Sequence, residues 1–257
     1  MKNKIVLLLL ALASHSSLLG ATLLQDDFNM NGNLNGQSPD VGSPWSVSGT
    51  NLSVSGGALE LPSIDGEASS SFASQSNTTL YAGLSFTVTQ SPSMAGSFFF
   101  SFLSGPMTIG RLFVTSTGNS GTFDIGIENN LDNPVDWTSS LNVGQQYRAV
   151  VGFTENGAND ISRLWINPLT ISSASVADDA ETITASLGGI RLHSNDPFPS
   201  GSTGTELLVN EIYVGDSFTD AAAVPEPSTS VLVMGGAVVV LAFLRRKKLT
   251  RRWRPTI

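Results

Sequence analysis

Paired carboxylates would be the first sign of an enzyme in this chain, which holds 21 acidic residues. Glycoside hydrolases use two carboxylates about 5 to 9.5 Å apart, and on a β-strand such a pair would stand two or four residues apart. Asp65 and Glu67 have this spacing, but a glycine between them makes the stretch turn-like. Asp178, Asp179 and Glu181 fall in a segment that reads as a polar loop. We therefore interpret both groups as solvated loop acids and expect no catalytic pair.

Histidine chemistry is limited by the number of histidines. Beyond the first 21 residues His193 is the only one, and it follows the strand expected over Leu187–Leu192. No Gly-x-Ser-x-Gly nucleophile elbow accompanies it. The chain also contains no cysteine, which excludes thiol catalysis and Cys-ligated metals. We expect His193 to be a solvated or capping residue, and we assign no catalytic residues.

The best metal candidate in the sequence is a short run of oxygen-bearing side chains. Asp27, Asn29 and Asn31 alternate and are followed by Gly32, as in the first half of a calcium loop. The acid expected at the twelfth position is missing, because Ser38 stands there. Asn/Gly-rich turns between strands produce the same pattern. We expect no cofactor and an ordinary turn, with calcium as the alternative.

Glycan binding would need an aromatic ring that covers the apolar face of a sugar. If Leu164 and Ile166 point into the core, Arg163 and Trp165 share the opposite face of their strand. These two residues are the candidate ligand-binding pair. The competing interpretation is that Trp165 simply covers its sheet.

The charge distribution restricts the partners. Between residues 22 and 224 the chain has four arginines, no lysine and twenty acids, a net charge of −16. Such a surface repels nucleic acid and anionic lipid, and it suits cations or neutral polymers such as glycans. Since no disulfide can form, core burial alone must hold the fold.

The elements that would position these residues are β-strands throughout the middle of the chain. Short apolar or alternating runs recur between Gly, Asn, Ser and Pro. The expected strands are Trp45–Val54, Ala58–Leu61, Ala68–Phe72, Leu80–Val88, Ser97–Leu103, Arg111–Thr115, Thr122–Glu128, Gln146–Thr154, Ile161–Ile166, Leu187–Leu192 and Glu206–Val214. Their number and spacing predict one all-β domain over residues 22–219, a two-sheet antiparallel sandwich or jelly roll.

The N-terminus has the pattern of a secretory signal peptide. Lys2 and Lys4 precede the apolar run Ile5–Ala13, and small or polar residues follow up to Gly20 and Ala21. The run is too short to cross a bilayer, which needs about 20 residues. We expect residues 1–21 to form a signal helix that is removed during export.

The C-terminus has its own membrane signal within residues 220–257. Ser228–Leu244 is an uncharged span of 17 residues, the short limit for a transmembrane helix. A basic cluster follows, made of Arg245, Arg246, Lys247 and Lys248. Clustered Lys/Arg beside an apolar span stay in the cytoplasm, so we expect this cluster to act as a membrane stop. The predicted orientation is outside to inside, in agreement with an exported N-terminus.

A proline motif stands just before this span and completes a recognisable signal. The residues Val224, Pro225, Glu226 and Pro227, then the apolar span and the basic cluster, resemble a PEP-CTERM sorting signal. The resemblance implies an exosortase, a membrane transpeptidase of Gram-negative bacteria that often make exopolysaccharide, as the processing partner. It also implies a transient stay in the inner membrane and then release or attachment at the cell surface. A plain single-pass anchor is the alternative.

The body is similar to concanavalin-like or laminin-G-like jelly rolls at its two ends. The opening Asp26-Asp27-Phe28, the Asn35-Gly36-Gln37 run before Trp45 and the closing run Asn210–Gly215 support this likeness. In that fold the first and last strands pair. The resemblance also implies a candidate calcium site that bridges these two strands through Asp27 and Glu211.

These observations favour a secreted or cell-surface protein whose sandwich is a non-catalytic structural or carbohydrate-binding module. Its setting would be the envelope or the exopolysaccharide matrix. The alternative is a secreted glycan-active enzyme, a hydrolase or lyase with a divergent site. Two carboxylates that converge in a groove would favour the enzyme.

Overall fold

A computed structural model describes residues 20–62, 65–76, 78–92, 97–129, 135–137, 139–155, 160–181, 186–194 and 205–223. The predicted signal peptide, apart from its last two residues, lies outside this part of the chain. The predicted sorting tail from Val224 onward also lies outside it. Among the described residues, no helix has the length and apolar character needed to cross a membrane.

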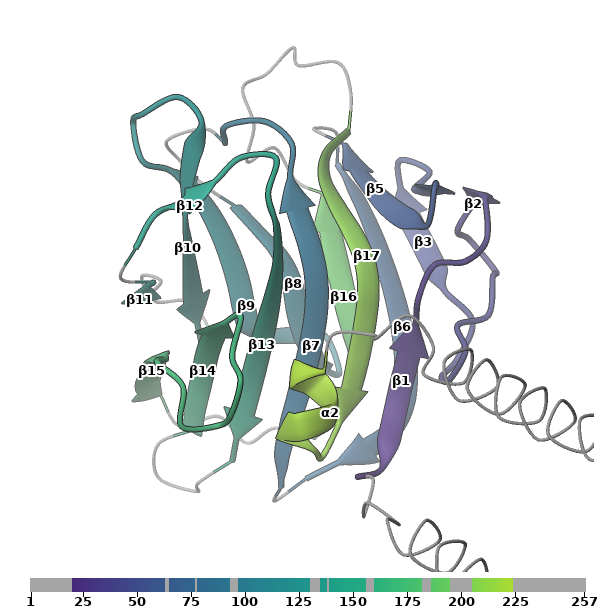
Figure 1. Cartoon of the computed structure of the whole chain (residues 1–257). Helices are drawn as coiled ribbons and strands as arrows, with labels where there is room; N and C mark the ends of the chain where they lie inside the picture. The colour runs from purple at the N-terminus through teal and green to yellow at the C-terminus, as the bar shows by residue number, and fades with distance from the viewer. Residues whose placement is uncertain are drawn as a thin grey trace, which may run out of the picture. The chain divides into compact units, whose positions relative to one another are not determined.

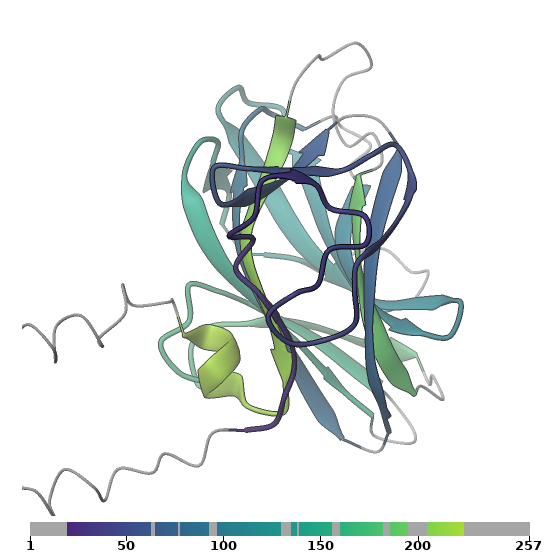
Figure 2. The ribbon, with the colours of Figure 1, turned by 90° about the vertical axis from the view of Figure 1, so that its right-hand side faces the viewer.

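The described residues form two stacked antiparallel sheets, which confirms the predicted all-β sandwich (Figure 1). Sheet A contains β1 (Thr22–Asp26), β2 (Gly32–Asn33), β4 (Ser53–Ser55), β5 (Ala58–Pro62), β7 (Thr79–Val88), β13 (Gln146–Thr154), β14 (Asp160–Ile166), β15 (Val176–Glu181) and β17 (Thr205–Gly215). Sheet B contains β3 (Ser46–Gly49), β6 (Gly66–Gln75), β8 (Ser97–Ser104), β9 (Met107–Ser116), β10 (Thr122–Glu128), β11 (Val135–Asp136), β12 (Leu141–Asn142) and β16 (Leu187–Ser194). Figure 2 shows the two layers from the side.

The first and last strands pair, as the resemblance implied. β1 runs antiparallel to β17, with Asp26 opposite Ile212. β17 also pairs with β7 and with β5, so the last strand lies in the interior of sheet A. The order from one edge is β15-β14-β13-β7-β17-β5-β4-β2.

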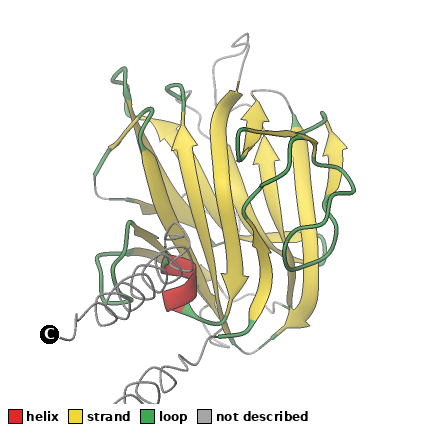
Figure 3. Cartoon of the chain, turned by 45° about the vertical axis from the view of Figure 1, so that its right-hand side comes forward, coloured by secondary structure: helices red, strands yellow, loops and turns green. Residues whose placement is uncertain are grey.

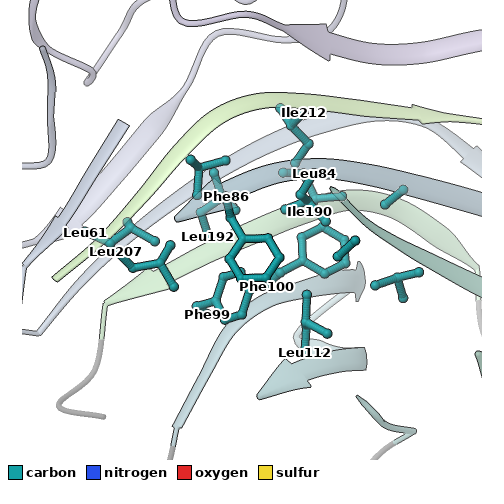
Figure 4. Packing of buried hydrophobic residues seen from close by; sticks show 14 of the residues in the cluster. Leu61, Leu84, Phe86, Phe99, Phe100, Leu112, Ile190, Leu192, Leu207 and Ile212 are labelled. Carbon is teal, nitrogen blue, oxygen red and sulfur yellow. The ribbon is translucent and has the colours of Figure 1, made fainter. Parts of the chain in front are cut away.

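The core lies between the sheets and follows the alternation in the sequence. On β7 every second residue, Leu80, Ala82, Leu84, Phe86 and Val88, is buried in this core. Figure 4 shows side chains of both sheets meeting in this layer. Sheet A provides Leu61, Leu84, Phe86, Leu207 and Ile212, and sheet B provides Phe99, Phe100, Leu112, Ile190 and Leu192.

A second, smaller apolar cluster lies on the outer face of sheet A. It consists of Val150, Trp165, Tyr213, Phe218 and Ala221, with Tyr81 and Ala222 packed against it. Part of it comes from helix α2 (Phe218–Ala222), which lies against this face (Figure 3). The helix approaches closely because β7 has a glycine beneath it: a Cβ at Gly83 would overlap the carbonyl of Ala221. The described fold belongs to a compact unit that ends at Ala222.

Two strand predictions were wrong. The predicted single strand over residues 45–54 is two strands in different sheets, β3 in sheet B and β4 in sheet A. The chain changes sheets after Gly49, which has a positive φ of 73° that favours glycine. The predicted polar loop around Asp178 is the edge strand β15. Its acids hid the strand pattern, because an edge strand can carry charges without losing its pairing.

Candidate functional site

A small pocket opens on the outer face of sheet A, next to the second apolar cluster. Its volume is about 200 Å³, and its lining residues come from β7, β13, β14 and the segment that follows β14. They are Tyr81, Gly152, Thr154, Ile161, Arg163, Trp165, Ile171 and Ser175. Both residues of the predicted ligand-binding pair, Arg163 and Trp165, therefore line one pocket.

The register of three strands builds this pocket. Gly152 on β13 stands opposite Tyr81 on β7 and opposite Arg163 on β14, so the three form one row across the sheet. The middle residue has no side chain, and this leaves a depression between its two larger neighbours. A Cβ at Gly152 would lie 3.1 Å from atoms of both Tyr81 and Trp165. Glycine therefore keeps the two rings close to the floor of the pocket.

Trp165 forms a wall of the pocket. Its side chain is 3% exposed. The indole Nε1 donates a 3.2 Å hydrogen bond to the carbonyl of Ile171, and Phe218 packs edge-on at 5.0 Å between ring centroids. As predicted, Trp165 faces away from the core that holds Leu164. Tyr81, at 6.3 Å from Trp165, is the more accessible ring.

Arg163 contributes the positive charge of the pocket. Its Nη1 donates to Ser175 Oγ at 3.2 Å, and its guanidinium carbon lies 5.9 Å from the centre of the Trp165 ring. Burial raises the pKa of the Tyr81 hydroxyl, and the nearby Arg163 charge acts in the opposite direction. Tyr81 is therefore a neutral phenol at physiological pH and can donate a hydrogen bond.

The segment between β14 and β15 closes one side of the pocket. Asn167 starts it with a positive φ of 48°, and its backbone and side chain exchange hydrogen bonds with Arg148 of the neighbouring strand. Ser173 Oγ then accepts hydrogen bonds from the backbone N–H groups of Leu169 and Thr170. These bonds position Ile171, whose carbonyl accepts the hydrogen bond from the Trp165 indole. The sequence offered no signal for this closure.

The predicted calcium residues are arranged differently from a calcium loop. Asn31 Oδ1 accepts a hydrogen bond from the backbone of Gly56 in the β4–β5 turn, 25 residues further along the chain. Asn29 donates from its amide to the Asp27 carboxylate. Asn31 therefore fixes a neighbouring turn, and Asn29 braces Asp27.

Asp27 meets two other carboxylates. Single oxygens of Asp26, Asp27 and Asp40 lie within 4.8 Å of one another. Burial, and then mutual repulsion among these acids, raise the pKa of Asp26 and of Asp40. Asp26 is already used by the fold, because it accepts from Trp45 Nε1 at 2.6 Å and from the Phe28 backbone at 2.8 Å. The three single oxygens that meet here are fewer than the six to eight that calcium takes, and calcium stays the alternative to an ordinary turn.

The outer face of sheet B holds the residues that the sequence placed in solvent. His193 is 7% exposed, stacks on Phe98 at 4.7 Å between ring centroids and lies within β16, so the expectation of a solvated or capping residue after the strand was wrong. Its Nε2 lies 3.6 Å from Glu67 and 3.8 Å from Asp65. Burial lowers the pKa of His193, and the two acids oppose this shift. Glu67 lies on β6 rather than in a loop, and it also pairs with Arg191 at 3.2 Å.

The same face continues as a row of rings and paired charges. Arg111 stacks over Phe98 and Phe113, at 5.5 and 5.7 Å from the ring centres, and pairs with Glu128 at 2.8 Å. Beside this row lies a second pocket of about 310 Å³, lined mainly by serines and glycines of β3, β6, β8, β16 and the neighbouring turns. Its lining carries no charge.

Asp178, also predicted to be a solvated acid, is buried. It accepts a 2.6 Å hydrogen bond from the backbone of Asn129. The amide of Asn129 bonds in turn to the Asp160 carbonyl and to the Ser162 hydroxyl. This network joins the end of β10 to β14 and β15, so the role of Asp178 is structural.

The C-terminal segment matches a known family model. Residues 223–248 match the PEP-CTERM protein-sorting motif, which includes both the Val224–Pro227 motif and the basic cluster Arg245–Lys248. This motif implies export and cell-surface sorting in Gram-negative bacteria, and it is consistent with exosortase processing. No curated protein sequence matched the chain.

Solved structures that resemble the fold include β-sandwich domains of glycosidases and carbohydrate-binding proteins. A Trypanosoma rangeli sialidase in complex with 2,3-difluorosialic acid superposes with a TM-score of 0.53 at 11% identity, over 79% of this chain and 31% of that one. The same sialidase with sialic acid gives 0.52 at 10% identity, over 78% and 32%. This chain thus spans about a third of the sialidase chains, and the likeness shows the fold alone. Domain 4 of a Geobacillus stearothermophilus arabinanase, with arabinotriose, gives 0.46 at 15% identity, over 79% and 99%; this score supports no inference.

Proposed function

We propose that the sandwich is a non-catalytic glycan-binding module that acts at the cell surface or in the exopolysaccharide matrix. One observation carries the proposal: the row Tyr81–Gly152–Arg163 forms a pocket with an aromatic ring on one side and a cation on the other. The sorting motif at residues 223–248 supports the surface part of this proposal.

The lining of the pocket has the chemistry that sugars require. The half-buried Tyr81 ring offers an apolar surface for the C–H face of a sugar. The Thr154 and Ser175 hydroxyls and the Arg163 guanidinium offer hydrogen bonds to sugar hydroxyls. At about 200 Å³ the pocket is smaller than the roughly 300–1,000 Å³ of drug-sized sites. It suits a single sugar ring, such as a chain end or a side branch.

Binding can be tested on protein purified after processing in an exosortase-bearing host. A glycan array should give reproducible ligands, and Tyr81→Ala and Arg163→Ala should each weaken the best of them by about tenfold or more. Leu169→Ala is the matched control, because this side chain is 93% exposed in the same segment and does not line the pocket. If no glycan binds, or if all three variants bind as the parent does, the pocket is not a glycan site.

Sorting is tested separately at the proline motif. Replacing Pro225, Glu226 and Pro227 by alanine should leave an unprocessed precursor in the inner-membrane fraction of the same host. Normal release of this variant would favour a plain anchor. The thermal midpoint of the body serves as the control, since the substitutions lie outside it.

A glycan-active enzyme is the second candidate, and one observation favours it. Asp65 and Glu67 both reach the same nitrogen of His193, so their separation lies within the range of up to about 9.5 Å used by glycosidase pairs. Against this role, Asp65 is 80% exposed at its side chain and Glu67 is held by Arg191. New reducing ends or unsaturated products from glycan substrates, lost in Glu67→Gln, would establish the enzyme. We expect no turnover.

A further inference from the structure

The four arginines of the body differ in how their charges are used. Three of them form ion pairs: Arg111 with Glu128 at 2.8 Å, Arg148 with Glu211 at 2.9 Å and Arg191 with Glu67 at 3.2 Å. Arg163 forms none with any residue that the structure describes. In a body of net charge −16, an arginine without an acid partner is an exception that needs a reason.

The residues directly opposite Arg163, Gly152 on β13 and Ala177 on β15, carry no charge. Asp179, diagonal to Arg163 on β15, forms no ion pair with it. Arg111, by contrast, stands directly opposite Glu128. The pocket lining contains no carboxylate either. The pocket is therefore locally positive although the surrounding body is strongly acidic.

The guanidinium retains unused hydrogen-bond donors. Arginine has five N–H donors in a planar fork that matches the two oxygens of a carboxylate. Within the described part of the chain, the Arg163 guanidinium donates a single hydrogen bond, to Ser175 Oγ. The contact with Trp165 orients the fork and leaves its donors available.

We propose that this pocket recognises the carboxylate of an acidic sugar residue, of the uronic acid type, with Arg163 as the carboxylate-binding residue. The inference rests on the proposed glycan-binding function and names its ligand class. The Tyr81 ring covers the sugar face while Arg163 pairs with the carboxylate. The sequence as a whole pointed to neutral polymers, and this pocket is the local exception.

The charge of the body further restricts the ligand. A polymer that is acidic at every residue is repelled by the −16 surface around the pocket. Screening over about 8 Å at physiological salt weakens this repulsion but leaves the direct contact. A mostly neutral chain with one acidic residue at its end therefore fits best.

The test uses three galactose-type trisaccharides in calorimetry with the processed protein at 150 mM NaCl. One is neutral, one carries a single terminal galacturonate, and one is galacturonate throughout. We expect the singly acidic sugar to bind about tenfold more tightly than the neutral one, the difference of one charge-assisted contact. The fully acidic sugar should fall below the singly acidic one and recover as salt is raised.

Variants separate this inference from the proposed function. Arg163→Gln should bring the acidic and neutral sugars to within about twofold of each other, while Arg191→Gln, which removes a paired arginine of sheet B, should keep the preference. A preference unchanged in Arg163→Gln, with all binding lost in Tyr81→Ala, overturns the carboxylate assignment but keeps a glycan site. Tighter binding of a terminal 6-sulfated sugar also overturns it. Binding of none of the sugars removes the proposed function as well.

Discussion

The two outer faces of the sandwich both carry aromatic residues and arginines, but these residues have different roles on each face. On sheet A, aromatic rings gather under helix α2 into a second small core, and arginine occurs there both buried and in an open pocket. On sheet B, the rings of Phe98 and Phe113 alternate with arginines whose charges are matched by acids. On sheet B both arginines are neutralised by ion pairs, whereas on sheet A Arg163 has no ion pair with a described residue and is available for a ligand.

The acids near the arginines pair with them on sheet B but not at Arg163. An acid directly or diagonally opposite an arginine can pair with it on the same face of a sheet. Glu128 is directly opposite Arg111, and Glu67 is diagonal to Arg191. Gly152 and Ala177 are directly opposite Arg163, and Asp179 is diagonal to it on β15 without forming an ion pair. We infer that the lack of an ion pair, and not strand position by itself, distinguishes Arg163.

The largest expected effect comes from removing the buried arginine of sheet A. Arg148 is buried and donates to the Ala221 carbonyl of α2, to Ser85 and to Glu211. Arg148→Met leaves Glu211 buried without its partner, which should lower the free energy of unfolding by about 3–5 kcal/mol. Urea unfolding followed by tryptophan fluorescence would measure the loss.

The matched variant on sheet B is Arg191→Met. The Arg191 side chain is 26% exposed and its partner Glu67 is 31% exposed. Exposed pairs contribute about 0–1 kcal/mol, so this variant should unfold close to the parent. Equal losses in the two variants would contradict the contrast drawn between the faces.

A smaller effect is expected where α2 meets the sheet. Gly83→Ala places a methyl group against the Ala221 carbonyl and the Arg148 guanidinium. The helix must move outward, at a cost of about 1–3 kcal/mol. The near-UV circular dichroism of Trp165 should change too, because Phe218 of the helix packs on this ring.

Gly188→Ala is the control for this substitution on sheet B. A Cβ there would meet its nearest atom, Ser74 Oγ, at 3.6 Å, an ordinary contact. We expect a change within about 0.5 kcal/mol. A Gly83→Ala protein as stable as the Gly188→Ala protein would show that α2 is held loosely.

Local patterns predicted the parts of this molecule that depend on alternation. The inward residues of β7 and the shared outer face of Arg163 and Trp165 follow from the period of two along one strand. The pocket itself needs β7 and β13 in register, with Tyr81 opposite Gly152, 71 residues later in the chain. No local pattern encodes such a pairing.

The missed features have equally definite causes. His193 looked solvated because its partners Glu67 and Phe98 are distant in sequence and meet it only through strand pairing. Helix α2 has five residues, too few for a helical period to show. β15 reads as polar because it carries three acids, of which Asp178 serves a buried network around Asn129. In each case the deciding interaction is non-local.

The smallest expected effect is a pH dependence that differs between the faces. Burial lowers the pKa of His193 on sheet B below its ordinary 6.5, against the opposing effect of Glu67 and Asp65. The stability that this neutral histidine contributes is therefore present above pH 6.5 and lost as the pH falls through the lowered pKa. On sheet A, burial raises the pKa of Glu211 above its ordinary 4.5. That carboxyl contributes stability below pH 4.5, which is lost as the pH rises through the raised pKa.

Comparison with His193→Gln isolates the histidine, because Glu211 is present in both proteins. Between pH 7.5 and 5.5 the parent should lose stability relative to His193→Gln, because its buried histidine resists protonation. Thermal midpoints of the two proteins, measured side by side at each pH, give the difference and cancel the contribution of the other acids. Parallel curves would mean that His193 is accessible enough to charge freely. In that case the charge balance of the outer face of sheet B would depend only on the ion pairs of Arg111 and Arg191.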